Sequence, residues 1–311
     1  MIDIVIVNWN SGQQLKACIG SINAYNKGEV SRIIIVDNGS ADGSLDAVDG
    51  LPLVEIILIG ENIGFGAACN IGARFGRSPY LLFLNPDTRV EKNSISAPLS
   101  FLEQKRNMNV AVCGIQLVDE RGNVSRTSAR FPTFSRFFSS AVGLNKLPGL
   151  LGSGVHMSDW RHDDTKKVDH VIGAFYLVRR GIYKLAGGFD ERYFVCFEDV
   201  DLSKAIHDFG YTSCYLTNAK AFHAGGGTSR QVKAHRLFYS LRSRLLYGFK
   251  YFSLWQAWLL VVVTNLFEPC TRLVWCVILA GFQRVKHIWA AYRMLWLNIG
   301  HTLRGQGTYN P

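Results

Sequence analysis

Short runs of β-branched and aliphatic residues alternate with helical stretches over the first 115 residues of the chain. Strands separated by helices in this way are typical of βαβ units and of a mostly parallel sheet. The expected fold class is therefore α/β. The predicted strands are Ile2–Val7, Ile33–Val36, Val54–Ile59, Tyr80–Leu84 and Val110–Ile115, with helices from about Gln13, over Gly66–Phe75 and over Asn93–Gln104.

The pattern becomes irregular between Leu117 and Lys167, where prolines, glycines and serines predict loops and a hairpin over one edge of the sheet. Regular structure then returns. Strands are expected at Val171–Val178 and Thr212–Leu216, and helices near Ile182–Leu185 and over Val200–Phe209.

Composition changes sharply near residue 230. The residues from Arg230 onward contain eleven Lys or Arg and one acid, Glu268, whereas the first 229 residues hold 23 charges of each sign. The tail therefore carries the whole net charge of +10, and it also contains five of the seven tryptophans. We expect one domain over residues 1–229 and a helical tail over residues 230–311.

Two apolar stretches, Leu254–Phe267 and Leu273–Phe282, dominate the tail. Each is shorter than the roughly 20 residues that a membrane-spanning helix needs. Tryptophans and cations beside apolar faces are typical of helices that lie in the membrane interface. A peripheral contact with a membrane surface is expected, the alternative being a helical pair that packs on the domain or forms a dimer. Basic stripes for nucleic acid rarely accompany such apolar runs, so no nucleic-acid partner is expected.

The cysteines and the amino terminus favour a cytoplasmic location. The seven cysteines form neither a CxxC pair nor a zinc-type spacing, which is typical of reduced thiols. The first residues have no basic region and too short an apolar run for a signal peptide.

Two predicted strands end on carboxylates. Asp87 follows an apolar run and an Asn85-Pro86 turn, and Asp37 ends the second strand. The carboxyl ends of strands are where open α/β sheets bind ligands. Asp87 is therefore a candidate ligand of a divalent cation, and Asp37 a candidate partner of a nucleotide base or ribose. Both segments are also rich in turn formers, so simple turns are the alternative.

The segment Gly64–Gly66 opens a predicted helix, but Cys69 stands where the dinucleotide fingerprint needs its third glycine. A dehydrogenase is therefore disfavoured. Glycines at a helix start still allow a nucleotide to approach the backbone closely. Asn62 and Asn70 flank this element and could bind the ligand or brace loops.

The densest cluster of acids is Glu198, Asp199 and Asp201, just before an apolar helix. Acids at a helix amino terminus stabilise it through the macrodipole. Alternatively, aromatic surroundings would raise the pKa of a carboxyl by desolvation, which suits a general base, and Glu198 or Asp199 would serve. His223, which precedes three glycines, could be structural or could supply a nitrogen ligand to a metal.

These motifs, in this order, resemble the inverting glycosyltransferases of family 2, and most closely the bacterial rhamnosyltransferases that build O-antigen and other cell-wall polysaccharides. The matching segments are Val5–Ser11, Val36–Ser40, Glu61–Gly66 with Asn70, Leu84–Asp87, Gly187–Glu191, Phe197–Asp201 and His223.

The resemblance implies a GT-A fold and a set of site residues. Asp87 and His223 would hold Mg²⁺ or Mn²⁺ on the diphosphate, and Asp199, beside Glu198, would be the catalytic base. The acceptor side would be bordered by Gly188, Phe189 and Asp190. The nucleotide-sugar would lie against Asn8, Asp37, Asn62, Gly64, Asn70 and Asn85.

The resemblance further implies transfer of L-rhamnose from dTDP-rhamnose to a polyprenyl-diphosphate-linked saccharide, at the cytoplasmic face of the bacterial inner membrane. Asn85 replaces the first acid of the family's usual Asp-x-Asp motif. The resulting Asn-Pro-Asp sequence is the form that the rhamnosyltransferases tend to show. UDP-hexose, UDP-GlcNAc and UDP-galactofuranose are alternative donors. A sugar nucleotidyltransferase would need a basic, glycine-rich loop after the first strand, where Asn8–Gly12 stands instead. A non-catalytic membrane or nucleic-acid binder is the third class.

Overall fold

The computed structural model describes residues 1–144, 157, 160–225, 232–279 and 285–305, and one large sheet organises it. The strand order is β3-β2-β1-β4-β10-β6-β11-β5, and β8 pairs with β11. These strands are β1 (Ile2–Asn8), β2 (Val30–Asp37), β3 (Val54–Leu58), β4 (Tyr80–Leu84), β5 (Thr88–Val90), β6 (Val110–Val118), β8 (Lys166–Val168), β10 (Phe175–Arg179) and β11 (Thr212–His223).

The predicted parallel sheet is confirmed at its centre, where β1 pairs in parallel with β2 and β4, and β2 with β3. Every residue of β1 and of β4 is buried, as expected for strands covered on both faces. The prediction of a single strand over Val171–Val178 was wrong. That segment is divided into β9 (His170–Val171), which pairs with β7 (Ser128–Ala129), and the antiparallel β10, inserted between β4 and β6.

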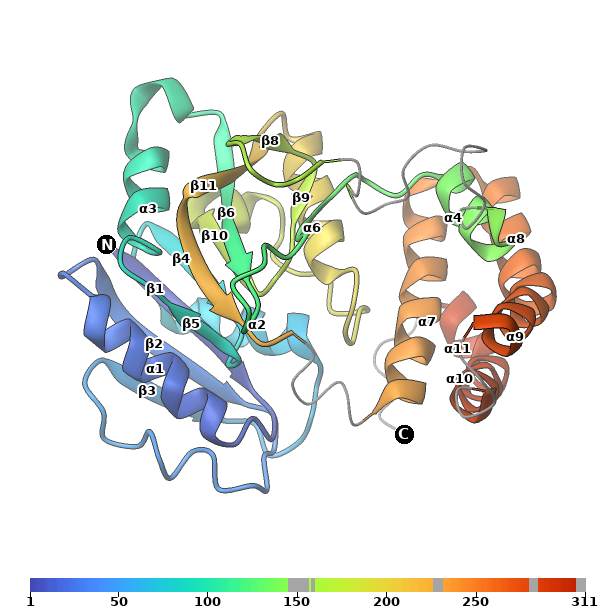
Figure 1. Cartoon of the computed structure of the whole chain (residues 1–311), viewed down its shortest axis with the longest axis horizontal. Coiled ribbons are helices and arrows are strands. Elements are labelled where there is room, and N and C mark those ends of the chain that lie inside the picture. The colour runs from blue at the N-terminus through green and yellow to red at the C-terminus, as the bar shows by residue number, and fades with distance from the viewer. Residues whose placement is uncertain (145–156, 158–159, 226–231, 280–284, 306–311) are drawn as a thin grey trace.

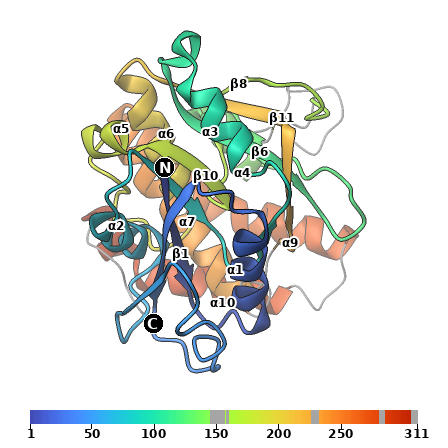
Figure 2. The ribbon, with the colours of Figure 1, turned by 90° about the vertical axis from the view of Figure 1, so that its left-hand side faces the viewer.

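Helices cover both faces of the sheet. In Figure 2, α1 (Gln13–Tyr25) lies on one side of β1 and α2 (Phe65–Phe75) on the other. The first face also carries α3 (Ser96–Glu103), and the second carries α5 (Arg180–Leu185) and α6 (Glu198–Asp208). Gly72 brings α2 close to the sheet, because a Cβ there would lie 2.5 Å from Val5 Cγ1.

The tail is helical, as predicted, and it packs as a separate layer. Figure 1 shows α7 (Lys233–Tyr251) standing between the sheet and the outer helices. Those helices are α4 (Phe134–Ala141), α8 (Leu254–Val262), a π-helical turn (Val263–Phe267), α9 (Glu268–Leu279), α10 (Val285–Leu297) and α11 (Ile299–Leu303). α4 lies within the stretch expected to form only loops and a hairpin. The boundary expected near residue 230 falls at residues outside the described ranges and stays a prediction.

Candidate functional site

The ends of β1 and β2 form a rigid, polar corner. Asn8 and Asp37 are partners in the parallel register, and Asn8 Nδ2 donates to Asp37 Oδ1 at 2.8 Å. The same Nδ2 lies 2.8 Å from Ser44 Oγ, and Asn8 is completely buried. Asp37 Oδ2 accepts from the amides of Gly39 and Ser40 at 3.1 and 2.9 Å. Asn8 therefore positions Asp37 and the loop after it, from beneath the surface.

Gly64 is required for a close contact within the protein. Its φ is +93°, and a Cβ there would lie 2.5 Å from the carbonyl oxygen of Phe194. Asn62 Oδ1 accepts from the Gly64 amide at 3.0 Å and so fixes this turn. The amide of Phe65 donates to the same Phe194 carbonyl at 2.8 Å. The start of α2 is thereby held against the segment that precedes α6.

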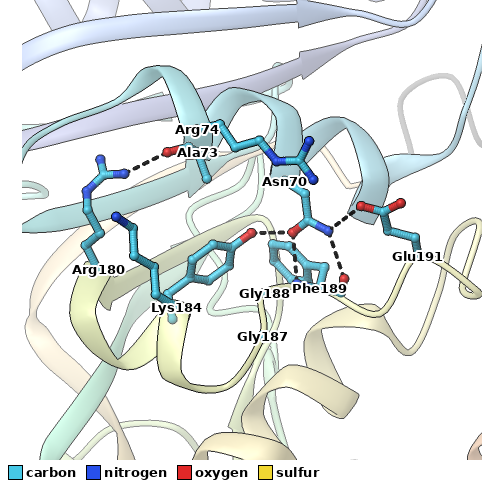
Figure 3. A pocket seen from close by; sticks show the side chains of 10 residues that line it. Asn70, Ala73, Arg74, Arg180, Lys184, Gly187, Gly188, Phe189 and Glu191 are labelled. Carbon is cyan, nitrogen blue, oxygen red and sulfur yellow. Dashed lines mark hydrogen bonds between the residues drawn. The ribbon is translucent and has the colours of Figure 1, made fainter.

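Asn70, further along α2, holds the segment Gly187–Glu191, called the glycine-rich loop below. Its Nδ2 donates to the Phe189 carbonyl and to Glu191 Oε1, both at 2.8 Å. Its Oδ1 accepts from the Phe189 amide at 2.9 Å and from the Tyr183 hydroxyl (Figure 3). Both polar atoms of the Asn70 side chain form hydrogen bonds within the protein. Of the two roles considered for Asn70, ligand binding and bracing of loops, these contacts support the second.

The Asn85-Pro86-Asp87 segment is both a turn and a means of presenting a carboxylate. The Thr88 amide donates to the Asn85 carbonyl at 3.1 Å, which closes a β-turn with proline at its second position. β11 continues well beyond the predicted Leu216 and pairs His223 with Thr88. His223 Nε2 consequently lies 3.3 Å from Asp87 Oδ1, and both side chains are largely buried. The two predicted metal ligands are thus brought together.

The Glu198–Asp199 pair begins α6 after an unusual backbone. Cys196 and Phe197 have φ values of +69° and +73°, a left-handed conformation that costs side-chain-bearing residues about 1–3 kcal/mol each. This backbone conformation determines how the Glu198 and Asp199 side chains are oriented at the start of α6. Glu198 is buried, and burial together with the charge of Asp199 raises its pKa to about 8. Among the described residues, Glu198 Oε2 has no hydrogen-bond partner.

Asp199 has the opposite electrostatic environment. Its Oδ2 lies 3.3 Å from His170 Nε2 and accepts from the Gly173 amide at 2.8 Å, while Oδ1 accepts from the Val200 amide at 2.8 Å. Burial acts to raise the pKa of Asp199, but the imidazole and the two amides outweigh it, so the pKa is lowered. The rise in pKa expected from burial therefore occurs at Glu198, whereas it is outweighed at Asp199.

His170 was missed by the sequence reasoning. It is 4% exposed and lies on β9, one residue before the strand predicted to start at Val171. A lone histidine at the edge of a strand carries no signal of its own. Only its closeness to Asp199 in the folded chain reveals it.

The glycine-rich loop before α6 is anchored to the tail. Asp190 pairs with Arg192 at 2.6 Å and with Lys250 of α7 at 2.9 Å, and Lys250 also reaches Asp201 at 2.8 Å. Burial acts to raise the pKa of Asp190, but these two cations hold it well below its usual range. Phe189 is 2% exposed and packs among other aromatic rings. Phe189 is therefore part of the packing beneath the predicted acceptor side.

A cavity of about 420 Å³ lies between α2 and α5 (Figure 3). Its lining includes Arg74 and Lys184, and it contains none of the acids that end β2, β4 or the turn before α6. Its lining also includes Gly188 and Phe189, so the cavity borders the predicted acceptor side but is separate from Asp37, Asp87 and Asp199.

One short segment joins the two groups of acids. The Gly173 amide donates to Asp199, as described above, and the carbonyl of the next residue, Ala174, accepts from the Asn85 amide at 3.1 Å. Ala174 also accepts from the Thr88 hydroxyl at 3.3 Å. Consecutive residues therefore contact the Asp199 carboxylate and the turn that carries Asp87.

Residues 3–184 match the model of the family described as Glycosyl transferase family 2. The chain is 26% identical over 270 residues to the N-acetylglucosaminyl-diphospho-decaprenol L-rhamnosyltransferase of Mycobacterium tuberculosis (strain H37Rv), a match that covers 83% of this chain and 87% of the relative. It is 27% identical over 266 residues to rhamnosyltransferase WbbL of Escherichia coli (strain K12), covering 79% of this chain and 92% of the relative.

A solved structure with a similar fold is the mannosyltransferase PcManGT from Pyrobaculum calidifontis, in complex with GDP-Man and Mn²⁺. The TM-score is 0.54 at 13% identity, and the match covers 98% of this chain and 85% of the other. The predicted GT-A fold is confirmed. The sequence matches identify a glycosyltransferase and so exclude the nucleotidyltransferase and the non-catalytic binder.

Proposed function

Because the chain belongs to glycosyl transferase family 2, we propose that it transfers L-rhamnose from dTDP-rhamnose, with inversion, to a hydroxyl of a polyprenyl-diphosphate-linked saccharide. The observation that supports the proposal is the bridge made by Gly173 and Ala174, which connects the Asp199 carboxylate to the turn that carries Asp87. A leaving diphosphate and an attacking hydroxyl need separate groups at such a site. The names of the relatives support rhamnose and a lipid-linked acceptor.

Asp199 is the base in this proposal. Its lowered pKa keeps it ionised at neutral pH, so it accepts the proton of the acceptor hydroxyl as the hydroxyl oxygen forms a bond to C1 of the sugar. The bond from C1 to the diphosphate oxygen breaks, and the electron pair leaves with the nucleoside diphosphate. Attack on the face opposite the leaving group inverts C1. Glu198 is mainly protonated at pH 7 and therefore cannot share this role.

Asp87 and His223 fit a divalent cation that the donor helps to hold. The Asp87 carboxylate and the His223 imidazole, 3.3 Å apart, could supply one oxygen and one nitrogen ligand to the cation. In the described ranges, no group of three or more His, Cys, Asp or Glu side chains could hold a metal ion. Mg²⁺ and Mn²⁺ sites in such enzymes are commonly completed by phosphate oxygens. The cation, when bound, would neutralise charge on the leaving diphosphate. Asp37 would contact the nucleotide base.

The chain is proposed to work at the cytoplasmic face of the bacterial inner membrane, because a polyprenyl acceptor is anchored there. The basic tail supports this placement. It has a net charge of +10 and would be attracted to anionic lipid headgroups.

A donor panel tests the function. Purified protein is screened for thermal stabilisation by dTDP-rhamnose, UDP-hexoses, UDP-GlcNAc and UDP-galactofuranose, with and without Mg²⁺ or Mn²⁺, since a ligand that binds only the folded state raises its stability. Stabilisation by dTDP-rhamnose that increases with the cation is expected. If a UDP-sugar stabilised the protein more than dTDP-rhamnose does, that sugar would be assigned as the donor instead.

Transfer is then measured to a short polyprenyl-diphosphate GlcNAc. Asp199→Asn is expected to lower kcat by about 10²- to 10⁴-fold, the usual contribution of a general base. The matched control is Asp208→Asn, an exposed acid on the same helix, which should keep wild-type activity. No transfer by wild-type protein with any donor would refute the function, and full activity of Asp199→Asn would refute the base.

A further inference from the structure

The outer helix of the tail is longer than the sequence indicated. The two apolar stretches are joined, because Leu254–Cys276 forms one continuous helix of 23 residues. The π-helical turn ends at Phe267, two residues before Pro269, whose missing amide would otherwise interrupt the hydrogen-bond ladder. At about 1.5 Å per residue such a helix could cross the roughly 30 Å hydrocarbon core of a bilayer. Whether the helix crosses a bilayer depends on how it packs against the rest of the protein.

One face of this helix packs against α7 through buried, charged side chains. Arg244 of α7 donates to Thr264 Oγ1 at 2.8 Å and pairs with Glu268, which is 1% exposed. Arg272 pairs with the same carboxylate at 2.8 Å. Leu260 continues this face, and a Cβ at Gly248 of α7 would lie 3.0 Å from it. A helix that left α7 to cross a bilayer would take Glu268 into lipid without Arg244.

The helices on either side of Leu254–Cys276 in the chain pack against each other. Ala291, Tyr292 and Leu295 of α10 are buried in one cluster with residues of α7 such as Phe238 and Leu241. α7 is in turn attached by the Lys250 ion pairs to the part of the chain that carries the large sheet, called the catalytic half below. A single crossing by the helix between them would place α7 and α10 on opposite sides of the membrane, which this packing forbids.

The opposite face of the helix is apolar and exposed. Leu254, Trp255, Trp258 and Leu266 are 71, 63, 52 and 66% exposed, and Phe267 is 56% exposed. Folded monomers rarely expose so many large apolar side chains in one continuous stripe. This surface, Leu254, Trp255, Trp258, Leu266 and Phe267, is called the apolar stripe below.

The charge beside the apolar stripe favours lipid over a second copy of the chain. On α10, Lys286 and Arg293 are exposed together with Trp289 and Trp296, the combination typical of membrane interfaces. The tail has a net charge of +10, and its one acid, Glu268, is neutralised internally. Two such surfaces would repel each other, whereas anionic phospholipid would attract either one.

We infer that Leu254–Cys276 lies in the plane of an anionic membrane surface, inserted by the apolar stripe, and does not cross the bilayer. The inference deepens the proposed function, since it specifies how an enzyme for a lipid-linked acceptor reaches its substrate. α7, α10 and the catalytic half all remain on one side of the membrane.

Vesicle flotation tests the apolar stripe. Full-length protein is mixed with vesicles of phosphatidylcholine and phosphatidylglycerol at about 7:3, and also with phosphatidylcholine alone. Wild type should float with the anionic vesicles, and Leu266→Glu should bind at least about tenfold less at equal thermal stability. Leu185→Glu, a change at an exposed leucine of α5, is the matched control and should float like wild type. Equal flotation of Leu266→Glu and wild type would overturn the inference. So would a wild-type dimer, insensitive to lipid, that Leu266→Glu converts to a monomer.

Thiol labelling tests the absence of a crossing. In a Cys270→Ser background, Lys286→Cys marks α10 and Lys16→Cys marks the catalytic half, and both positions are exposed. A membrane-impermeant maleimide should label neither marker in intact spheroplasts and both in inside-out vesicles, above the background of the parent. Labelling of Lys286→Cys alone in spheroplasts would demonstrate a crossing and refute the inference. Neither experiment uses a sugar donor, so failure of the proposed function would be seen separately.

Discussion

Replacing Glu198 by Gln separates the two neighbouring acids of the candidate site. Burial and the charge of Asp199 raise the pKa of Glu198 from an ordinary 4.5 to about 8. At pH 7 about nine-tenths of the carboxyl is therefore protonated. Gln has nearly the same shape and is neutral, so it resembles the form of Glu198 that is already present. Glu198→Gln is expected to keep transfer within about threefold of wild type at pH 7, whereas Asp199→Asn loses it.

The same substitution should change how stability depends on pH. Between pH 4.5 and about 8 the unfolded chain releases the Glu198 proton while the folded protein retains it, so rising pH favours unfolding. With each unit of pKa difference equal to about 1.36 kcal/mol, the loss across this window is at most about 5 kcal/mol. Stability due to this group is complete below pH 4.5 and lost above about pH 8. Glu198→Gln should remove that contribution to the pH dependence.

The measurement is the free energy of urea unfolding at several pH values from 5 to 9. Wild type should lose stability relative to Glu198→Gln as pH rises, and the difference should level off above about pH 8. Glu103→Gln, at an exposed acid of α3, controls for the removal of one charge. Parallel curves for wild type and Glu198→Gln would refute the raised pKa. A loss of transfer at pH 7 as severe as that of Asp199→Asn would make Glu198 the base.

Two further substitutions test the positioning of the site. His170→Gln is expected to lower kcat by about 10²-fold with little change in donor KM, the cost of a misplaced group. It should also move the acidic limb of kcat/KM to higher pH, because the imidazole no longer lowers the pKa of Asp199. If the acidic limb of the kcat/KM profile did not move, His170 would have only a packing role. The control is His207→Gln, on the exposed side of α6. Gly64→Ala should destabilise the protein by about 1–3 kcal/mol more than Gly60→Ala, measured by urea unfolding. Both glycines have φ near +90°, but only at Gly64 would a Cβ meet backbone, at 2.5 Å, so equal losses would argue against the clash.

The parallel half of the sheet could be predicted because its information is local. β4 and the second halves of β1 and β2 are continuous apolar runs, and polar turn residues follow each strand directly in the sequence. The antiparallel β10 could not be predicted in the same way. Its position between β4 and β6 depends on pairing between residues about 95 apart, such as Leu84 and Phe175, which no short pattern records.

The candidate acids could likewise be found from local motifs, but the groups that control them could not. The lowered pKa of Asp199 depends on His170 and on the Gly173 amide, which approach it from β9 and from the segment after it. Aromatic neighbours in the sequence suggested a raised pKa for either acid. The folded chain divides the effect. Glu198 is buried, and its Oε2 has no hydrogen-bond partner among the described residues, whereas the partly buried Asp199 carboxylate is contacted by His170 and by two backbone amides.

The pairing of β11 explains how a site with Asn85 in place of an acid could still hold a cation. The predicted strand ended at Leu216, because Thr217 to Lys220 interrupts its apolar pattern. In the structure this interruption is an irregularity in the β11–β6 register between Leu216 and Lys220, after which pairing resumes. The resumed strand pairs with β5 and delivers His223 to Asp87. The proposed nitrogen ligand, His223, would therefore replace the absent carboxylate only because the bulge sets its register. A one-residue slip would turn His223 to the other face of the sheet.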